Sequence, residues 1–243
     1  MYDFKNFTLS DMTHCQMDLR KFGATSKTME ETSNKIVRYF YDNFIDSQTG
    51  EHNCVLVRLF KTYPYSDLNE RLRVLARNIL SAEPEDKDFR CLTLMATSGE
   101  KMEWNNRKLS SGHQAIPLQS EKFVLSFPMI SNLIKQLGLE ISQVVKPDPG
   151  MILDLNQKTY NIFYVPQALG NLIIPAQKEF VAPMGVQSVL GFGGVLPSGN
   201  LFIVIMFTRV NFPLNTAEMF KTLALSVKLA LIPFDGEKGA FEE

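Results

Sequence analysis

The sequence predicts an α+β protein in which helices pack on a central antiparallel sheet. Two observations lead to this prediction. First, residues 186–192 and 201–207 are apolar segments on either side of a turn cluster at 196–200, a pattern typical of a β-hairpin at the centre of a sheet. Second, the helices and strands along the chain are grouped and do not alternate strictly, which favours an antiparallel sheet over a parallel doubly wound one.

Amphipathic helices are predicted wherever apolar residues recur at helical spacing. They cover residues 28–45, 66–80, 126–137 and 216–232. Thr28 and Glu31 have the spacing of a capping box at the start of the first helix, and Gly138 follows the third helix where a C-terminal cap belongs. Asn215 or Thr216 is expected to cap the last helix.

Besides the hairpin, strands are predicted at residues 54–60, 89–97, 139–145, 151–155 and 159–165. Residues 1–24 show no sustained period and are expected to form a partly ordered lead-in. Residues 98–120 are polar and patternless but hold the only tryptophan, so we expect a loop that covers a binding pocket. The prediction is one domain over residues 25–233, followed by a polar tail at 234–243.

Composition disfavours several classes of partner. The net charge is −1, with 25 Lys and Arg against 26 Asp and Glu and no basic block, so nucleic acid is not expected as a partner. The longest apolar runs, 201–207 and 223–232, are shorter than the roughly 20 residues of a membrane span. The N-terminus lacks the pattern of a secretory signal, and three widely separated cysteines suit a reducing cytoplasm.

The order of these motifs resembles that of GAF domains, sensory relatives of the PAS fold. The resemblance covers roughly residues 26–232 and is carried by an opening helix and strand, a Gly-Val-x-Ser step at 185–188, a Gly-x-Leu turn at 199–201 and a closing helix. GAF domains are usually shorter, so residues 90–154 are expected to form an elaborated cover over the pocket. Their closing helix usually continues into an output domain, whereas Pro233 stops it here; we expect either a free-standing sensor or part of a longer protein.

The resemblance implies a cytoplasmic regulatory module that binds an unidentified small molecule over its sheet. Ligand state would pass through the terminal helices to an output partner, such as a histidine kinase of a two-component system, by a population shift. The sequence identifies no cofactor. Two alternatives from other classes remain: an enzyme on a GAF scaffold with an unrecognised site, and a dimerisation scaffold without a ligand.

Homodimerisation is predicted from the closing helix, which carries two apolar stripes. The first stripe consists of Phe220, Leu223, Val227 and Ala230, and the second of Leu225, Leu229 and Ile232. A helix that covers a sheet needs one apolar face, so the second stripe favours packing against the same helix of another subunit. The alternative is a helix wedged between the sheet and the helix at 28–45.

Candidate ligand contacts follow from residue type and position. Arg58 is the only charge in an apolar strand and suits recognition of a carboxylate, or else a structural ion pair. His113 in the cover could ligate a haem or a metal, or donate a hydrogen bond to an anionic ligand. The aromatic residues could line a pocket or belong to the core. The glycines allow close approach of a ligand or of another backbone, or else mark a bend. The candidates are Arg58, Trp104, His113, Phe163, Tyr164, Ser188, Gly191 and Gly193.

No catalytic or metal-ligating set is predicted. The three histidines, at positions 14, 52 and 113, do not have metal-ligand spacing. Cys54 and Cys91 lie in predicted buried strands and far apart in sequence, which does not support a thiolate with a nearby resolving thiol. Because no Gly-x-Ser-x-Gly elbow is present either, we do not expect an enzyme.

Overall fold

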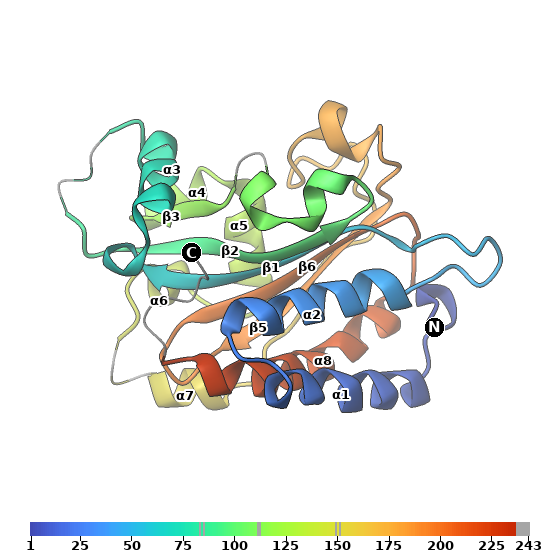
Figure 1. Ribbon diagram of the computed structural model, residues 1–243. Helices are drawn as coiled ribbons and strands as arrows, with labels where there is room; N and C mark the ends of the chain where they lie inside the picture. The colour runs from blue at the N-terminus through green and yellow to red at the C-terminus, as the bar shows by residue number, and fades with distance from the viewer. Residues whose placement is uncertain (83, 85, 111–112, 149, 151, 237–243) are drawn as a thin grey trace.

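A six-stranded antiparallel sheet forms the centre of the molecule, which is an α+β protein (Figure 1). The computed structural model describes residues 1–82, 84, 86–110, 113–148, 150 and 152–236. The strand order is β3-β2-β1-β6-β5-β4. The strands are β1 (Cys54–Pro64), β2 (Arg90–Gly99), β3 (Ala115–Leu118), β4 (Phe163–Val165), β5 (Ser188–Val195) and β6 (Leu201–Thr208).

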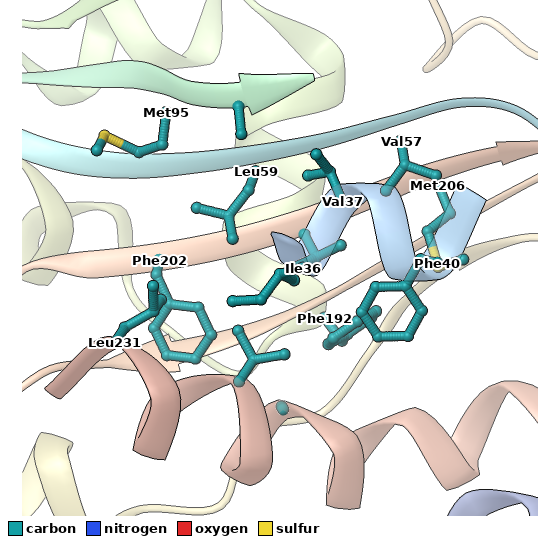
Figure 2. Close-up of a cluster of buried hydrophobic side chains, with 14 of the residues drawn as sticks. Ile36, Val37, Phe40, Val57, Leu59, Met95, Phe192, Phe202, Met206 and Leu231 are labelled. Carbon is teal, nitrogen blue, oxygen red and sulfur yellow. The ribbon is translucent and has the colours of Figure 1, made fainter. Parts of the chain in front are cut away.

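Three helices cover one face of the sheet, which we call the first face. They are α1 (Leu9–Ala24), α2 (Met29–Asn43) and α8 (Leu214–Leu231), and Figure 1 shows them gathered on the same side of the strands. Side chains from α2, α8, β1, β5 and β6 meet between the helices and the sheet (Figure 2). Phe40, Phe192 and Phe220 pack ring against ring there, with centroids 5.4 to 6.2 Å apart.

Shorter elements cover the opposite, second face. They are α4 (Glu121–Leu125), α5 (Pro128–Gln136), α6 (Ile141–Val145), α7 (Ile152–Gln157) and the π-helical turn η6 (Gln177–Val181). Their buried residues, such as Leu133, Ile141 and Leu155, form a separate apolar cluster with the outward side chains of the sheet. Helix α3 (Glu70–Leu80) packs beside β3 at the sheet edge. The remaining 3₁₀ turns are η1 (Phe4–Asn6), η2 (Tyr65–Asp67), η3 (Met102–Asn105), η4 (Arg107–Leu109) and η7 (Ile232–Phe234).

The elements with the strongest local patterns were predicted correctly. Helix α2 begins after Thr28, whose side chain accepts from the Glu31 backbone N–H, and α5 is followed by Gly138 at φ +82°. Strands β1 and β2 and the β5–β6 hairpin lie where they were predicted. The cap of α8 was predicted wrongly, because the helix begins at Leu214 after Pro213, which makes no side-chain cap bond.

Several weaker predictions were wrong. The strands predicted at 139–145 and 151–155 are the helices α6 and α7, because Ile141 and Val144 face the second-face cluster at helical spacing and tertiary packing outweighs their β-propensity. The strand predicted at 159–165 is only the short β4. Strand β3 was missed inside the predicted cover loop. Most of the predicted tail, residues 237–243, lies outside the described residues.

The predicted lead-in is instead helical, which corrects the expectation for residues 1–24. Helix α1 starts with a reciprocal capping box between Thr8 and Asp11 and packs against α8. Only Cys15, Leu19 and Gly23 are fully buried on it. A Cβ at Gly23 would lie 2.5 Å from the Ala230 carbonyl oxygen, so the two helices touch at backbone distance. This narrow contact face explains why the apolar period of α1 is weak.

The end of α8 is tied to the sheet by a buried ion pair. Lys61 on β1 and Asp235, just after η7, have side chains only 1% and 6% exposed, and their Nζ and Oδ1 atoms are 3.3 Å apart. The backbone N–H and hydroxyl of Ser198, in the β5–β6 turn, each donate to the Asp235 carboxylate at 2.7 Å. Asp235 therefore joins three segments that are distant in sequence.

Removing the Asp235 charge should destabilise the protein strongly, because the Lys61 ammonium would stay buried without its carboxylate. We expect Asp235→Asn to lower the free energy of unfolding by about 3 to 5 kcal/mol in urea denaturation. Glu179→Gln, at an exposed acid on η6, should change it by less than about 0.5 kcal/mol. The double variant Lys61→Met/Asp235→Leu should recover much of the loss. A loss below about 1 kcal/mol in Asp235→Asn would contradict this account.

Candidate functional site

Arg58 is a charged residue on the second face of the sheet, which is otherwise mostly apolar. Its neighbours along β1, Val57 and Leu59, belong to the first-face core, and side chains alternate along a strand, so Arg58 points the other way. Its Nη2 donates to Ser110 Oγ at 3.0 Å. The Nε atom is buried and has no hydrogen-bond partner within the described part of the chain. Burial lowers the pKa of Arg58 to about 10, so the guanidinium keeps its charge at neutral pH.

A second unsatisfied polar atom lies beside Arg58. Thr97 on β2 is directly opposite Arg58 in the register of the β1–β2 pair, and cross-strand partners share a face of the sheet. Thr97 is 3% exposed, and its Oγ1 finds no hydrogen-bond partner among the described residues. Buried polar atoms are nearly always bonded, so two such atoms on neighbouring strands mark this spot as unusual.

His113, in the segment between β2 and β3, lies close to Arg58. It has a left-handed backbone, φ 56°, and the residue as a whole reaches the surface. Burial of part of the ring and, secondly, the positive charge of Arg58 lower the pKa of His113. The imidazole is therefore neutral at pH 7 and offers one donor and one acceptor nitrogen.

Trp104 packs at the same end of the second face. Its ring contacts Gly99, where an added Cβ would lie 3.0 Å from Trp104 Cε3, and Gly99 is opposite Leu56, two residues from Arg58 on the same face. The indole also meets Phe180 edge-on with ring centroids 5.5 Å apart. We call Arg58, Thr97, Ser110 and His113 the Arg58 site; Trp104 forms its apolar flank.

The segment between β2 and β3, residues 100–114, is held in place at several points, and we call it the cover segment. The Asn105 amide donates to the Gly99 carbonyl oxygen at 2.8 Å. Arg107 makes a two-pronged ion pair with Glu30 on α2, at 2.5 and 3.0 Å. Arg71 on α3 donates to the Lys108 carbonyl oxygen and to the Gln114 side chain. The cover segment thus links Arg58, through Ser110, to α2 and α3.

The other five candidates do not join this group. Phe163 is buried, and Gly191 leaves room for it, since a Cβ there would lie 3.2 Å from Phe163 Cβ. Tyr164 packs against the opposite, first-face core and donates to the Phe212 carbonyl oxygen. The Ser188 hydroxyl is already bonded to Thr208 and to the Val210 carbonyl oxygen. A Cβ at Gly193 would collide with the Phe202 carbonyl oxygen, so this glycine allows the close approach of the neighbouring strand and not of a ligand at that position.

Sequence reasoning missed Thr97 and Ser110, although both belong to the Arg58 site. Thr97 ends a predicted strand, and its importance depends on the β1–β2 register. Ser110 lies in the predicted loop, and its importance depends on how that loop packs on Arg58. The three cysteines are buried, and burial raises the pKa of Cys15 to about 11 and of Cys91 to about 12. Such thiols are poor nucleophiles at neutral pH.

Neither similarity to known proteins nor a metal-ligand cluster or membrane-spanning helix among the described residues indicates a function. Neither protein-family models nor curated protein sequences yielded a match to this chain. Within the described residues, no three His, Cys, Asp or Glu side chains are grouped so that they could hold a metal ion. None of the described helices has the length and apolar character needed to cross a bilayer. Functional inference therefore rests on the geometry of the chain itself.

The proximity of Arg58 and His113 can be tested by histidine titration. Arg58→Gln removes the nearby positive charge that opposes protonation of the imidazole, so the pKa of His113 should rise. The measurement is an NMR pH titration of the His113 ring protons, with His14 on α1 as the reference signal in the same spectra. An unchanged or lower pKa of His113 in Arg58→Gln would show that the two groups do not interact.

Proposed function

We propose that the chain is a GAF-like regulatory module that binds a small anionic molecule at the Arg58 site. The observation that carries this proposal is a charged guanidinium whose buried Nε has no hydrogen-bond partner among the described residues, beside Thr97 Oγ1, for which the described residues offer none either. A ligand carboxylate could accept from both groups and relieve the cost of leaving them unsatisfied. The α+β architecture, with an antiparallel sheet under a separate cover, is compatible with the GAF resemblance.

The proposed mechanism is a shift between two positions of the cover segment. Ser110 occupies one donor of Arg58, so a ligand carboxylate that binds Arg58 competes with or reorients this hydroxyl. Because Arg107 in the same segment is paired with Glu30, the displacement would reach α2. Helix α2 packs against α1 and α8, which would pass the change to an output partner such as a histidine kinase. Ligand binding then favours one of the two arrangements.

Ligand retention tests the proposal directly. Native mass spectrometry of the protein, compared with its denatured mass, should reveal a bound small molecule that is lost or bound at least about tenfold more weakly in Arg58→Gln, because a hydrogen bond to a charged group is lost. Arg77→Gln, at an arginine of α3 paired with Glu70, should retain it.

Three other outcomes would change the assignment. Turnover of the retained molecule would favour the enzyme alternative. If the native protein carries nothing and a panel of carboxylate metabolites produces no thermal shift, the scaffold alternative replaces the sensor. Equal retention by Arg58→Gln and Arg77→Gln would place the ligand elsewhere.

We also propose that the module forms a homodimer through α8. The first apolar stripe of this helix is buried in the first-face core. The second stripe remains at the surface, with Leu225, Leu229 and Ile232 exposed by 51%, 44% and 37%. Leu225 and Leu229 lie on one side of α8, and Ile232, at its C-terminal cap, is three positions further on. The same stripe of a second copy could cover them.

Charge in the centre of this stripe should separate the subunits. In sedimentation velocity, the wild-type protein should be a dimer at micromolar concentration and Leu229→Glu a monomer, because a buried carboxylate at the contact is costly. Leu172→Glu, at a leucine that is 94% exposed away from α8, should stay dimeric. A wild-type protein that is monomeric at 100-fold higher concentration would rule out this interface.

A further inference from the structure

A polar cleft separates α2 from the cover segment, at the edge of the sheet. It has a volume of about 620 Å³, within the range of small-molecule pockets. One wall is a face of α2, residues 105–108 form the other, and Thr97 and Ser98 of β2 lie between them. Strand β3 pairs only with residues 90–93 of β2, so this end of β2 has no further strand beside it in the described structure. The sheet edge therefore opens into the cleft.

Polar contacts connect the two walls of the cleft and fix their positions. The Arg107–Glu30 pair joins them at one point, with side chains only 5% and 13% exposed. Asn105 joins them at another, because its Oδ1 accepts from Arg38 of α2 at 3.2 Å and from Ser98 Oγ at 3.2 Å. A site whose walls are bonded to each other before a ligand enters loses little entropy on binding.

The lining is basic. Lys35, Arg38, Arg107 and Lys108 line the cleft together with one acid, Glu30. The Arg107–Glu30 pair is internally neutral, which leaves three positive side chains. One of these, Lys35, is half-buried and donates to the Thr25 carbonyl oxygen at 2.6 Å. Lys35 and Arg38 also have acidic partners four residues away on α2, Glu31 and Asp42, in ion pairs at the helix surface. Such pairs are weak, so an incoming anion can displace them.

Lys108 adds a charge that is not compensated in this way. It is exposed at the surface, and it forms no ion pair with any acid in the part of the chain that the structure describes. Asn106 holds the backbone of this turn, since its side chain accepts from the Lys108 N–H at 2.8 Å. The Lys108 backbone is therefore fixed at the rim of the cleft, which Lys108 lines together with Lys35 and Arg38.

We propose that this cleft is a second binding site, which borders the Arg58 site at Thr97, for a small phosphorylated metabolite. The phosphate dianion matches three cations better than a single carboxylate does, and Arg and Lys side chains are the usual phosphate ligands. The amide and hydroxyl groups of Asn34, Asn106 and Ser98 then face the polar body of the molecule. The nearly complete lack of apolar side chains in the lining, with Val37 the exception, favours a hydrophilic body over an aromatic one.

A titration with inorganic phosphate tests the site without knowledge of the metabolite. In ¹H–¹⁵N NMR spectra of the full chain, at constant ionic strength balanced with sodium chloride, phosphate should cause saturable shifts of the amides of Lys35, Arg38 and residues 105–108. The variants Arg38→Ala and Lys108→Ala should each weaken phosphate binding by about tenfold. Both side chains are exposed, so the fold and the melting temperature should be preserved.

Lys122→Ala, at an exposed lysine of α4 that does not line the cleft, is the matched control and should bind phosphate as the wild type does. Shifts that stay linear in phosphate concentration would overturn the proposal, as would equal affinity in Lys108→Ala and Lys122→Ala. Saturable shifts confined to Arg58, Ser110 and His113 would also overturn it and assign the phosphate to the Arg58 site. The experiment can thus contradict the proposal for one site without contradicting the proposal for the other.

Discussion

Burial of both faces of one sheet is the constraint on which the rest of the structure depends. The middle strands β1 and β6 carry apolar side chains on both sides, so each face must be covered to remove it from water. Helices α1, α2 and α8 cover the first face, and the short elements between β3 and β5 cover the second (Figure 1). The long middle of the chain is therefore a structural cover and not an appended domain.

Strand β1 carries two cations, Lys61 and Arg58, in this apolar setting, and the two differ in their partners. Lys61 forms an ion pair with Asp235, and Ser198 donates two hydrogen bonds to the same carboxylate. Among the described residues, Arg58 has only the neutral Ser110 hydroxyl as a side-chain hydrogen-bond partner, and its Nε stays unbonded. A buried charge is stable when it is paired and hydrogen-bonded. Lys61 thus has a structural explanation, whereas Arg58 is the stronger candidate for recognising an external anion.

The cover segment lies between the two proposed sites. Ser110 faces Arg58 on the second face, whereas Arg107 and Asn105 line the cleft beside α2. Thr97 is opposite Arg58 in register and also borders the cleft. Because one short segment contacts both, an anion bound at either site would act on the position of the same backbone. If both proposed sites bind anions, the cover segment provides a physical route for energetic coupling between them.

The sequence alone determined the elements whose signals are local. The stripe and cap of α2, the alternation of β1 and the turn between β5 and β6 depend on neighbours within a few residues, and three members of the candidate region, Arg58, Trp104 and His113, were recognisable as unusual residues in such elements. Only the tertiary structure decided the rest. Helices α6 and α7 form because their apolar side chains pack against the second face of the sheet. The pairing of Arg58 with Thr97 depends on strand register, and that of Lys61 with Asp235 on chain reversal; no local pattern encodes either.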